Sequence, residues 1–257
     1  QNCTLTGNAT APDGVGSAFL QIAYSGEGAA CAFTACTIAG NTGSTYGACV
    51  LAALPGNAGL THTMVSTLVA GNAAPNFLLD GNPVFVSLGH NLDGDGTSGL
   101  VNGVNGDLVG TAATPIDAKL GPLQDNGGPT LTMALLSGSP ALDTGACMDA
   151  NGSPLRVDQR GFPRPQGAGC DIGAYENQPL LLTCPPGVVV EFVGQTGAVA
   201  TFTVTVSDPC PGVTLTVTPP SGSLFPIGVT PVLAQAADAC GNSAQCSFNV
   251  TVLGARG

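Results

Sequence analysis

Cys3-Thr-Leu-Thr-Gly-Asn8 recurs in the chain as Cys36-Thr-Ile-Ala-Gly-Asn41 and again as Thr67-Leu-Val-Ala-Gly-Asn72. The three asparagines lie 33 and then 31 residues apart. Each copy is a short strand that ends in Gly-Asn, where the chain must turn through a conformation that Gly and Asn tolerate. Repeated short strands with polar turns predict a solenoid in which each coil hydrogen-bonds to the next.

The same copies predict what lies inside the solenoid. Leu5, Ile38 and Val69 occupy equivalent positions, so we expect them to stack inside the coils. Equivalent positions on adjacent coils lie about 4.8 Å apart, which is within reach of a disulfide between Cys3 and Cys36. Helix signals are absent, because no apolar residues recur with a helical period.

Composition excludes several classes of partner. The chain has 257 residues, with 16 acidic and 5 basic residues and a net charge of −11. Because so few basic residues could neutralise phosphates, we expect neither nucleic acid nor an anionic membrane as a partner. No apolar run approaches the roughly 18–20 residues needed to cross a bilayer, so no membrane span is expected.

The ten cysteines indicate the compartment. They are spread along the chain, and none forms the CxxC pairs of a zinc ribbon or a thioredoxin-like site. Disulfides formed in an oxidising compartment are the simplest interpretation, so we expect an extracellular or cell-surface protein. The pairing among Cys3, Cys31, Cys36 and Cys49 stays open at this point.

Six blocks in the middle of the chain carry a family resemblance. They are Leu88–Thr97, Gly106–Thr111, Gly121–Pro129, Ser137–Asp143, Asp158–Pro165 and Cys170–Glu176. In this order they resemble the C-terminal end of the choice-of-anchor Q group of secreted bacterial β-helix proteins, over roughly residues 60–176. The resemblance implies a right-handed parallel β-helix finished by a cap, and it implies no chemistry. We expect Cys147 and Cys170 to stabilise this cap as disulfide cysteines.

The pattern changes after a linker expected at residues 177–183. Residues 198–206 alternate strictly, with Phe202, Val204 and Val206 on one face and threonines on the other, and residues 246–252 do the same. Such alternation is typical of antiparallel strands that cover a core on one side only. Several such strands separated by Pro/Gly turns predict a small sandwich.

The sandwich also carries a resemblance. Cys184-Pro, Asp208-Pro-Cys210 and Ala237–Phe248 resemble a hyalin-repeat (HYR) module, an immunoglobulin-like domain, over residues 184–252. That resemblance favours the pairings Cys184–Cys246 and Cys210–Cys240, each worth about 2–4 kcal/mol in so small a domain. The whole chain is therefore expected to be all-β, with a parallel β-helix and cap over residues 1–176, a linker, and a sandwich over residues 184–257.

Charged residues cluster in the expected cap. Three of the five bases, Arg156, Arg160 and Arg164, fall within nine residues and lie beside several acids. A guanidinium can bridge carboxylates and fix a loop-rich segment where strands are few. The expected structural ion-pair network consists of Asp158, Arg160, Arg164, Asp171 and Glu176. Ligand binding by the same residues is the alternative.

Asp93-Gly-Asp95-Gly resembles the start of a calcium-binding loop, in which alternating carboxylates converge on one ion. Residues 96–106 contain no acid, so the downstream ligand of an EF-hand is missing. We favour a polar glycine-rich turn and keep a calcium site at Asp93 and Asp95 as the alternative. No other cofactor is expected.

Catalysis is not expected. The β-helix is a common scaffold of polysaccharide lyases and hydrolases. Their active sites need clustered carboxylates or a base beside a metal-binding acid. Residues 1–110 contain no Lys or Arg, and their acids fall in expected turns. His62 and His90 are far apart in sequence and are expected in turns or on the surface. We therefore name no catalytic residue, and a polysaccharide-active enzyme is the third hypothesis.

The first hypothesis is structural. The repeat already begins at Asn2, and the end coil of a solenoid exposes unpaired N–H and C=O groups that natural proteins normally cover. If Gln1 is the native terminus, this end should pair with another copy, and a head-to-tail contact that does not close builds a fibre or surface layer. The second hypothesis is an adhesion or ligand-binding module of a larger surface protein. Cell-surface or matrix polysaccharide is a further expected partner.

Overall fold

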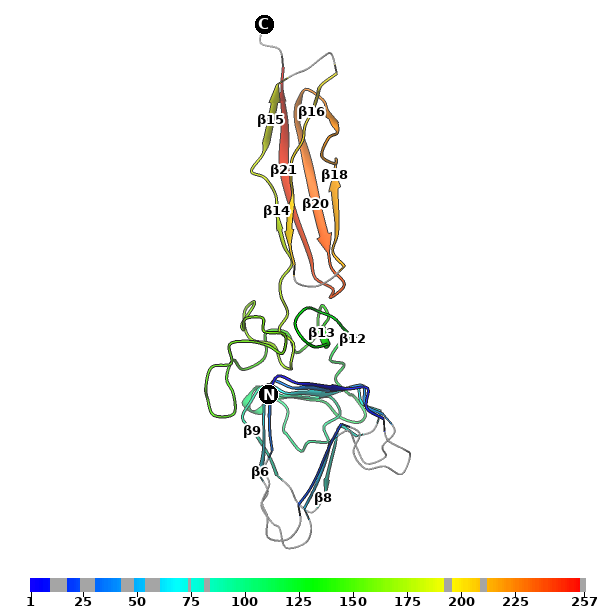
Figure 1. Cartoon of the computed structure of the whole chain (residues 1–257), viewed down its shortest axis with the longest axis vertical. Coiled ribbons are helices and arrows are strands. Elements are labelled where there is room, and N and C mark those ends of the chain that lie inside the picture. Colours follow the sequence, from blue (N-terminus) through cyan, green and yellow to red (C-terminus); the bar gives the residue numbers. More distant parts are fainter. Residues whose placement is uncertain are drawn as a thin grey trace. The chain divides into compact units, whose positions relative to one another are not determined.

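The computed structural model describes residues 1–9, 18–23, 31–42, 49–53, 61–73, 75–80, 84–191, 196–208 and 212–254. Within these ranges the structure is built of strands, with a short 3-10 turn at Val104–Gly106 and no α-helix, which confirms the all-β prediction. The chain separates into two compact units, Gln1–Asn177 and Gln178–Gly257 (Figure 1). No helix in the described part of the chain is long and apolar enough to cross a membrane.

The first unit is built on three sheets that the chain visits in turn. The first sheet has the order β1 (Thr4–Thr6), β4 (Thr37–Ala39), β7 (Leu68–Ala70), β10 (Leu92–Asp93) and β11 (Leu108–Val109). The second has the order β2 (Phe19–Ala23), β5 (Cys49–Ala53) and β8 (Phe77–Asp80), and the third has the order β3 (Ala32–Thr34), β6 (Thr61–Val65) and β9 (Val84–Ser87). All of these pairings are parallel.

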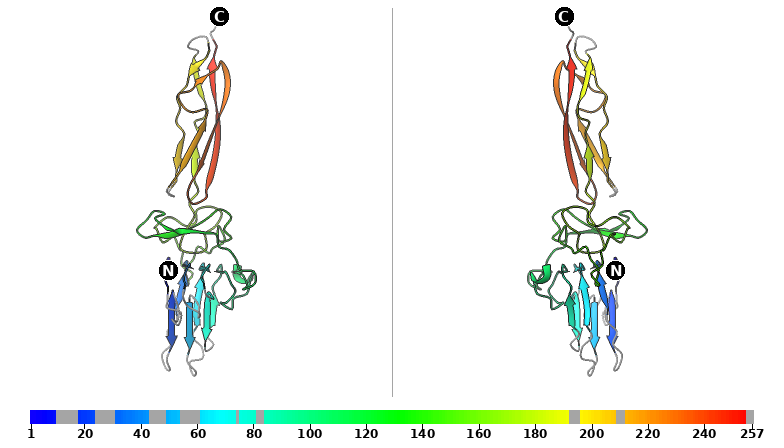
Figure 2. Two further views of the ribbon diagram at one scale, coloured as in Figure 1. Left: turned by 90° about the vertical axis from the view of Figure 1, so that its right-hand side faces the viewer. Right: turned by 90° about the vertical axis from the view of Figure 1, so that its left-hand side faces the viewer.

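Each passage through the three sheets adds one strand to every sheet, and we call it a coil. Coil 1 contains β1 to β3, coil 2 contains β4 to β6, and coil 3 contains β7 to β9. Figure 2 shows strands of successive coils side by side in chain order, from blue to teal. Leu5, Ile38 and Val69 are in register and pack in one apolar cluster, so the predicted interior column is present.

Every coil enters the first sheet through a left-handed corner. The φ angle is 51° at Asn2, 47° at Ala35, 47° at Ser66 and 58° at His90. Asn adopts this region readily, whereas Ala and Ser do so less often. Backbone hydrogen bonds hold the corners, since Ala35 N–H donates to Val65 C=O at 3.0 Å.

The Gly-Asn repeat forms an asparagine ladder between coils. Asn8 donates its backbone N–H and its Nδ2 to Oδ1 of Asn41, at 3.1 and 2.9 Å. Asn41 donates in the same way to Oδ1 of Asn72, at 3.1 and 3.0 Å. Asn72 then donates to Asn76 at 2.9 Å, and Asn76 donates to Oδ1 of Asp93 at 2.9 Å. The ladder therefore ends on a carboxylate.

The rest of the first unit covers the outer face of the first sheet. A hairpin of β12 (Leu120–Gln124) and β13 (Thr132–Leu135) is followed by residues 143–176, which contain only isolated bridges and which we call the cap. Ala174 N–H donates to the Thr37 hydroxyl at 2.9 Å, and Gly173 N–H donates to Ser66 C=O at 2.7 Å. The cap is therefore hydrogen-bonded to coil 2 and to the corner that leads into coil 3.

The second unit contains eight strands in its described part. A four-stranded sheet has the order β15 (Val188–Glu191), β21 (Ser243–Leu253), β20 (Gly228–Ala237) and β18 (Thr214–Thr218). Two antiparallel pairs join β14 (Leu181–Thr183) to β17 (Thr205–Ser207) and β16 (Ala198–Val199) to β19 (Leu224–Phe225). One apolar core includes Ala198 and Phe225 from the pairs and Val232, Phe248 and Val250 from the sheet.

Three details of the second unit differ from the sequence prediction. Residues 181–183, expected in a linker, form β14. β15 pairs with β21 in parallel, so the unit is not purely antiparallel. The strand expected at residues 198–206 is interrupted, because residues 200–204 lie outside the ladders. Phe202 and Val204 nevertheless pack against the core, as the alternation predicts.

Candidate functional site

The five residues predicted to form an ion-pair network come together in the cap, and all of them are buried. We call Asp158, Arg160, Arg164, Asp171 and Glu176 the cap cluster. The structure forms two ion pairs among them, Arg160–Asp158 at 2.8 Å and Arg164–Glu176 at 2.7 Å. The cluster is the largest concentration of buried charge among the described residues, and it is therefore the first candidate for a functional site.

Arg160 joins separate segments of backbone. Its Nε donates to Asp158 at 2.8 Å, its Nη1 donates to Asn126 C=O at 2.9 Å, and its Nη2 donates to Glu176 C=O at 2.6 Å. The guanidinium lies 3.7 Å from the centroid of the Tyr175 ring, close enough for a cation–π contact. One side chain thus ties the end of the β12–β13 hairpin to the end of the cap.

Arg164 makes a second set of such bonds. Its Nη1 donates to Glu176 Oε2 at 2.7 Å and to Asp171 C=O at 2.9 Å, and its Nη2 donates to Gly173 C=O at 2.6 Å. Glu176 also accepts the backbone N–H groups of Gln166 and Asp171, at 2.8 and 3.0 Å. Burial lowers the pKa of Arg164 and raises the pKa of Glu176, while their mutual attraction opposes both shifts.

Asp171 has a different role from the one predicted. Its carboxylate accepts the N–H of Asp143 at 2.8 Å and the N–H of Asn177, and Arg164 bonds its backbone carbonyl instead of its side chain. Burial, followed by the nearby charge of Glu176, raises the pKa of Asp171 to about 7. Asp171 therefore connects the two ends of the cap.

This geometry bears on the two interpretations of the cap cluster. The side chains of both ion pairs have no exposed surface. The two guanidinium groups donate to backbone carbonyls of the cap and of the hairpin end, whereas the buried Arg164 Nε has no hydrogen-bond partner among the described residues. The arrangement therefore favours a structural network over a ligand site.

Asp93 and Asp95, the alternative calcium ligands, are both engaged in hydrogen bonds within the chain. Asp93 is buried and accepts hydrogen bonds from Asn76 Nδ2 at 2.9 Å and from Ser98 N–H at 2.8 Å. Asp95 accepts the Thr97 hydroxyl at 2.6 Å and Asn76 N–H at 2.8 Å. In the described residues, no three His, Cys, Asp or Glu side chains gather to hold a metal ion. The two carboxylates fix a turn.

The structure forms two of the expected disulfides. Cys147 is bonded to Cys170 in the cap with a Cα–Cα distance of 5.5 Å, and Cys184 is bonded to Cys246 in the second unit with a distance of 6.0 Å. Cys240 is also disulfide-bonded. Its expected partner, Cys210, lies outside the described residues.

The coils, in contrast, hold free thiols. Cys3, Cys31 and Cys36 are unbonded, so the bridge between Cys3 and Cys36 that the coil spacing allows is not formed. The thiols of Cys3 and Cys36 each donate to the carbonyl two residues earlier, at 3.2 and 3.3 Å, as the Thr67 hydroxyl of coil 3 does at 3.1 Å. At this position of each coil the side chain therefore forms a hydrogen bond, and no disulfide links Cys3 to Cys36. The side chain of Cys49 lies outside the described residues.

His62 is buried in β6 and not in a turn, which corrects the prediction. Its Nδ1 accepts the N–H of Cys31 at 3.2 Å and lies 3.0 Å from the Cys31 sulfur. Burial lowers the pKa of His62 and raises the pKa of Cys31 to about 11, so the pair is uncharged near neutral pH. A thiol without thiolate character is not an activated nucleophile. The 31-residue repeat was the signal that could have placed these two residues together.

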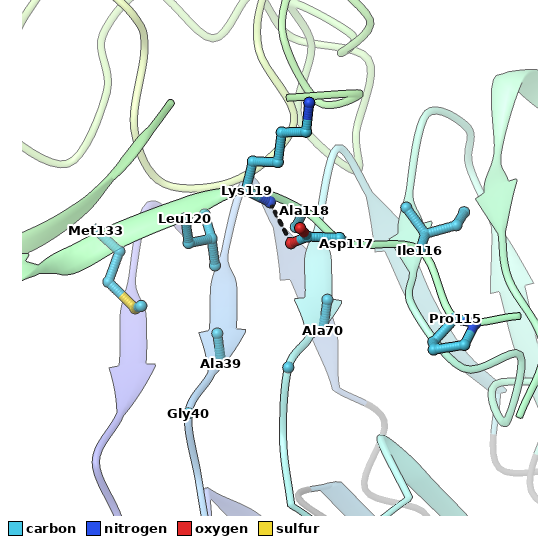
Figure 3. A pocket seen from close by; sticks show the side chains of 11 residues that line it. Ala39, Gly40, Ala70, Pro115, Ile116, Asp117, Ala118, Lys119, Leu120 and Met133 are labelled. Atoms are coloured by element: carbon cyan, nitrogen blue, oxygen red, sulfur yellow. Dashed lines mark hydrogen bonds between the residues drawn. The ribbon is translucent and has the colours of Figure 1, made fainter. Parts of the chain in front are cut away.

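A groove of about 420 Å³ lies over the first sheet (Figure 3). Its floor is made of small residues of coils 2 and 3, Ala39, Gly40, Ala70 and Gly71, and residues 115–120 cross above them. The Lys119 side chain points away from the floor, and its backbone N–H donates to Asp117 at 2.8 Å. Among these lining residues no nucleophile lies beside a base.

Comparison with known proteins concerns the second unit. Residues 177–252 match the family model of the HYR domain. No curated protein and no solved structure matches the chain. The comparisons thus support the HYR resemblance of this part of the chain, and they offer no counterpart to the choice-of-anchor Q resemblance of residues 60–176.

Proposed function

We propose that the chain is an extracellular, non-enzymatic module of a cell surface that takes part in adhesion. The observation that carries this proposal is the HYR match over residues 177–252, because HYR domains are extracellular modules associated with cell surfaces and adhesion. The Cys147–Cys170 and Cys184–Cys246 bridges suit an oxidising compartment. Cell-surface or matrix polysaccharide remains our proposed class of ligand.

In this proposal the first unit is a scaffold, a right-handed parallel β-helix closed by the cap. Three observations support it: three parallel sheets visited in turn, an interior apolar column, and an asparagine ladder between coils. A stack of coils joined by backbone hydrogen bonds gives a stable support for a binding module. The choice-of-anchor Q relationship belongs to the same proposal.

The absence of catalysis is also part of the proposal. Four buried acids of the first unit accept hydrogen bonds from backbone N–H groups of this chain: Asp93, Asp158, Asp171 and Glu176. A glycosidase needs two carboxyl groups that face a bound sugar. Incubation with neutral and acidic polysaccharides, with and without calcium, should yield no cleavage products, and cleavage in any of these reactions would contradict this point.

Antibody labelling tests the location, and coated beads test adhesion. Antibodies against the chain should label intact cells of the producing organism as strongly as permeabilised cells. Beads coated with the full chain should attach to those cells or to their extracellular matrix, whereas albumin-coated beads should not. Labelling confined to permeabilised cells would contradict the location, and equal attachment of both kinds of bead would contradict adhesion.

Self-assembly into a fibre is the second candidate function. The observation that favours it is that β1, β2 and β3 each stand at the end of a sheet in the described structure. Sedimentation and electron microscopy over a range of concentration and salt should then show growing filaments. Monomers throughout that range would remove this candidate and leave the adhesion proposal intact.

A further inference from the structure

The outer face of the four-stranded sheet in the second unit carries a hollow of about 540 Å³. The hollow lies over β18, β20 and β21, which are neighbours in that sheet (Figure 1). Two rows of exposed residues in register across the three strands line it: Thr216, Gln235 and Gln245 in one row, and Thr214, Ala237 and Ser243 in the next.

The order of residues along β20 explains why the sheet is hollowed here. Val232 and Ala234 are buried, so the alternating residues Leu233, Gln235 and Ala237 point outward, and their size falls toward the end of the strand. Ala237 therefore leaves space in the middle of its row. Leu233 is 41% exposed and adds an apolar surface one row beyond the glutamines.

The lining side chains are polar and uncharged. Each glutamine amide offers donors and an acceptor, and the hydroxyls of Thr216 and Ser243 can do both. Within the described part of the chain, no hydrogen bond engages the side-chain amides of Gln235 and Gln245. The Thr214 hydroxyl donates to Ala237 C=O at 3.2 Å, and its oxygen can still accept. Such a set suits a ligand that carries many hydroxyl groups.

The backbone around the hollow is held in place. β20 and β21 are joined by a turn in which Asp238 N–H donates to Asn242 C=O at 3.1 Å, and the Asn242 side chain donates to the Asp238 carboxylate at 2.6 Å. Cys246, which follows Gln245, is bonded to Cys184, and Cys184 packs against the core. A site on paired strands keeps the relative positions of its side chains.

Charge distinguishes among ligands that carry hydroxyl groups. None of the lining residues is charged, and Asp238, which follows Ala237, is an acid. The chain as a whole has a net charge of −11. A polymer of uronic acids or sulfated sugars would therefore be repelled, whereas a neutral polymer would not.

From these features we infer that the hollow is a binding site for a neutral polysaccharide. This inference rests on the proposed function, since it gives the polysaccharide ligand a site and a charge class. One sugar ring would lie over Ala237, with its hydroxyls bonded to Gln235 and Gln245, and the next ring would pack its C–H groups on Leu233. The hollow lies on the face of the sheet, so a peptide that adds to the edge of β18 through its backbone would bind elsewhere.

Native gels cast with a polysaccharide test the site. At least one of the neutral polymers dextran, pullulan and galactomannan should retard the full chain, whereas polygalacturonate and alginate should not. Titration calorimetry with the retarding polymer should give the same dissociation constant at low and at high salt, because no charges pair in the complex.

Two substitutions with a matched control locate the binding. Ala237→Phe fills the hollow and keeps every polar side chain, so it should abolish retardation. Thr203→Phe adds a phenyl ring at an exposed position outside the four-stranded sheet and should leave retardation unchanged. Gln235→Ala should weaken binding about 3–10-fold, the loss expected for neutral hydrogen bonds. Circular dichroism verifies that the variants fold.

Several results would overturn the inference. They are a chain that no neutral polymer retards, retardation that Ala237→Phe leaves unchanged, and stronger retardation by the anionic polymers. A dimer in sedimentation that Ala237→Phe dissociates would also do so, because a second copy would then fill the hollow.

Coated beads separate this inference from the adhesion proposal. If beads coated with the Ala237→Phe variant attach to cells as well as beads coated with the unaltered chain, the site is wrong and adhesion stands. If beads coated with the unaltered chain attach no better than albumin-coated beads, adhesion itself is contradicted.

Discussion

Arg164 and Glu176 form an ion pair of 2.7 Å in which neither side chain has exposed surface. Around this pair, the Arg164 guanidinium binds the carbonyls of Asp171 and Gly173, and the Glu176 carboxylate binds the N–H of Gln166. Two charges removed from water need such additional partners to be stable. The pair therefore orders the cap backbone, and the consequences of breaking it can be measured.

Arg164→Met should lower the free energy of unfolding of the first unit by about 3–5 kcal/mol, because Glu176 stays buried without its partner. Urea unfolding followed by circular dichroism measures this loss. Arg156→Met is the matched control, since Arg156 is exposed, and it should change stability by no more than about 0.5 kcal/mol. Equal effects of the two variants would show that the buried pair has no special role.

Asp171 should make the cap more stable in mild acid. Its pKa in the folded chain is raised to about 7 from an ordinary value of 3.8, so the folded state binds the proton more tightly than the unfolded state. The resulting stabilisation is complete below about pH 4 and is lost as the pH rises through 7. Melting temperatures of the first unit between pH 4 and 8 should fall accordingly. Asp171→Asn should flatten this slope, and an unchanged slope would assign it to other groups.

Asn41→Ala should destabilise the coils. Asn41 is fully buried, and its Nδ2 donates to Leu5 C=O at 3.0 Å while its Oδ1 accepts two bonds from Asn8. Leaving these groups unpaired costs about 1–3 kcal/mol for each group that water does not reach. Urea unfolding should reveal this loss. Asn151→Ala, at an exposed turn, serves as the control and should be neutral.

Calcium removal should have no effect on stability. The Asp93 and Asp95 carboxylates are already bonded to Asn76 and to the turn at residues 97–98. Melting curves recorded with a chelator and with millimolar calcium should therefore coincide. Asp93→Ala should lower stability in both conditions by a similar amount. A higher melting temperature in calcium that disappears in Asp93→Ala would restore the metal interpretation.

The sequence predicted the coils where a repeat was visible. The copies of the Gly-Asn strand share one register, so Leu5, Ile38 and Val69 could be aligned without a structure. The cap cluster could be predicted because basic residues are rare in this chain, and three of them lie beside several acids. What could not be seen was that Asp171 would accept backbone N–H groups, since those of Asp143 and Asn177 meet only after folding.

Other predictions were wrong because the alternation of side chains does not show which strand, if any, the backbone pairs with. Residues 200–204 alternate like a strand, yet Phe202 exchanges hydrogen bonds with the Ser221 side chain, at 2.9 and 2.8 Å, and not with a neighbouring strand. Alternation reports which face is buried, and it does not identify the partner of the backbone. The prediction that His62 lies in a turn or on the surface was wrong for a related reason. The hydrogen-bond partner of its buried imidazole is the Cys31 N–H, which lies one coil earlier in the sequence.

The attachment of the cap to Thr37 and Ser66 has a consequence for biogenesis. These contacts join residues more than a hundred positions apart, so the part of the outer surface at Thr37 and Ser66 is left uncovered until Gly173 and Ala174 have been synthesised. Contacts of such high sequence separation form slowly. During synthesis or secretion from the amino end, the coils therefore stay without their cap until residue 174 emerges. At roughly 5–20 residues per second this takes several seconds. We therefore expect nascent chains that stop before residue 173 to be aggregation-prone and to recruit chaperones.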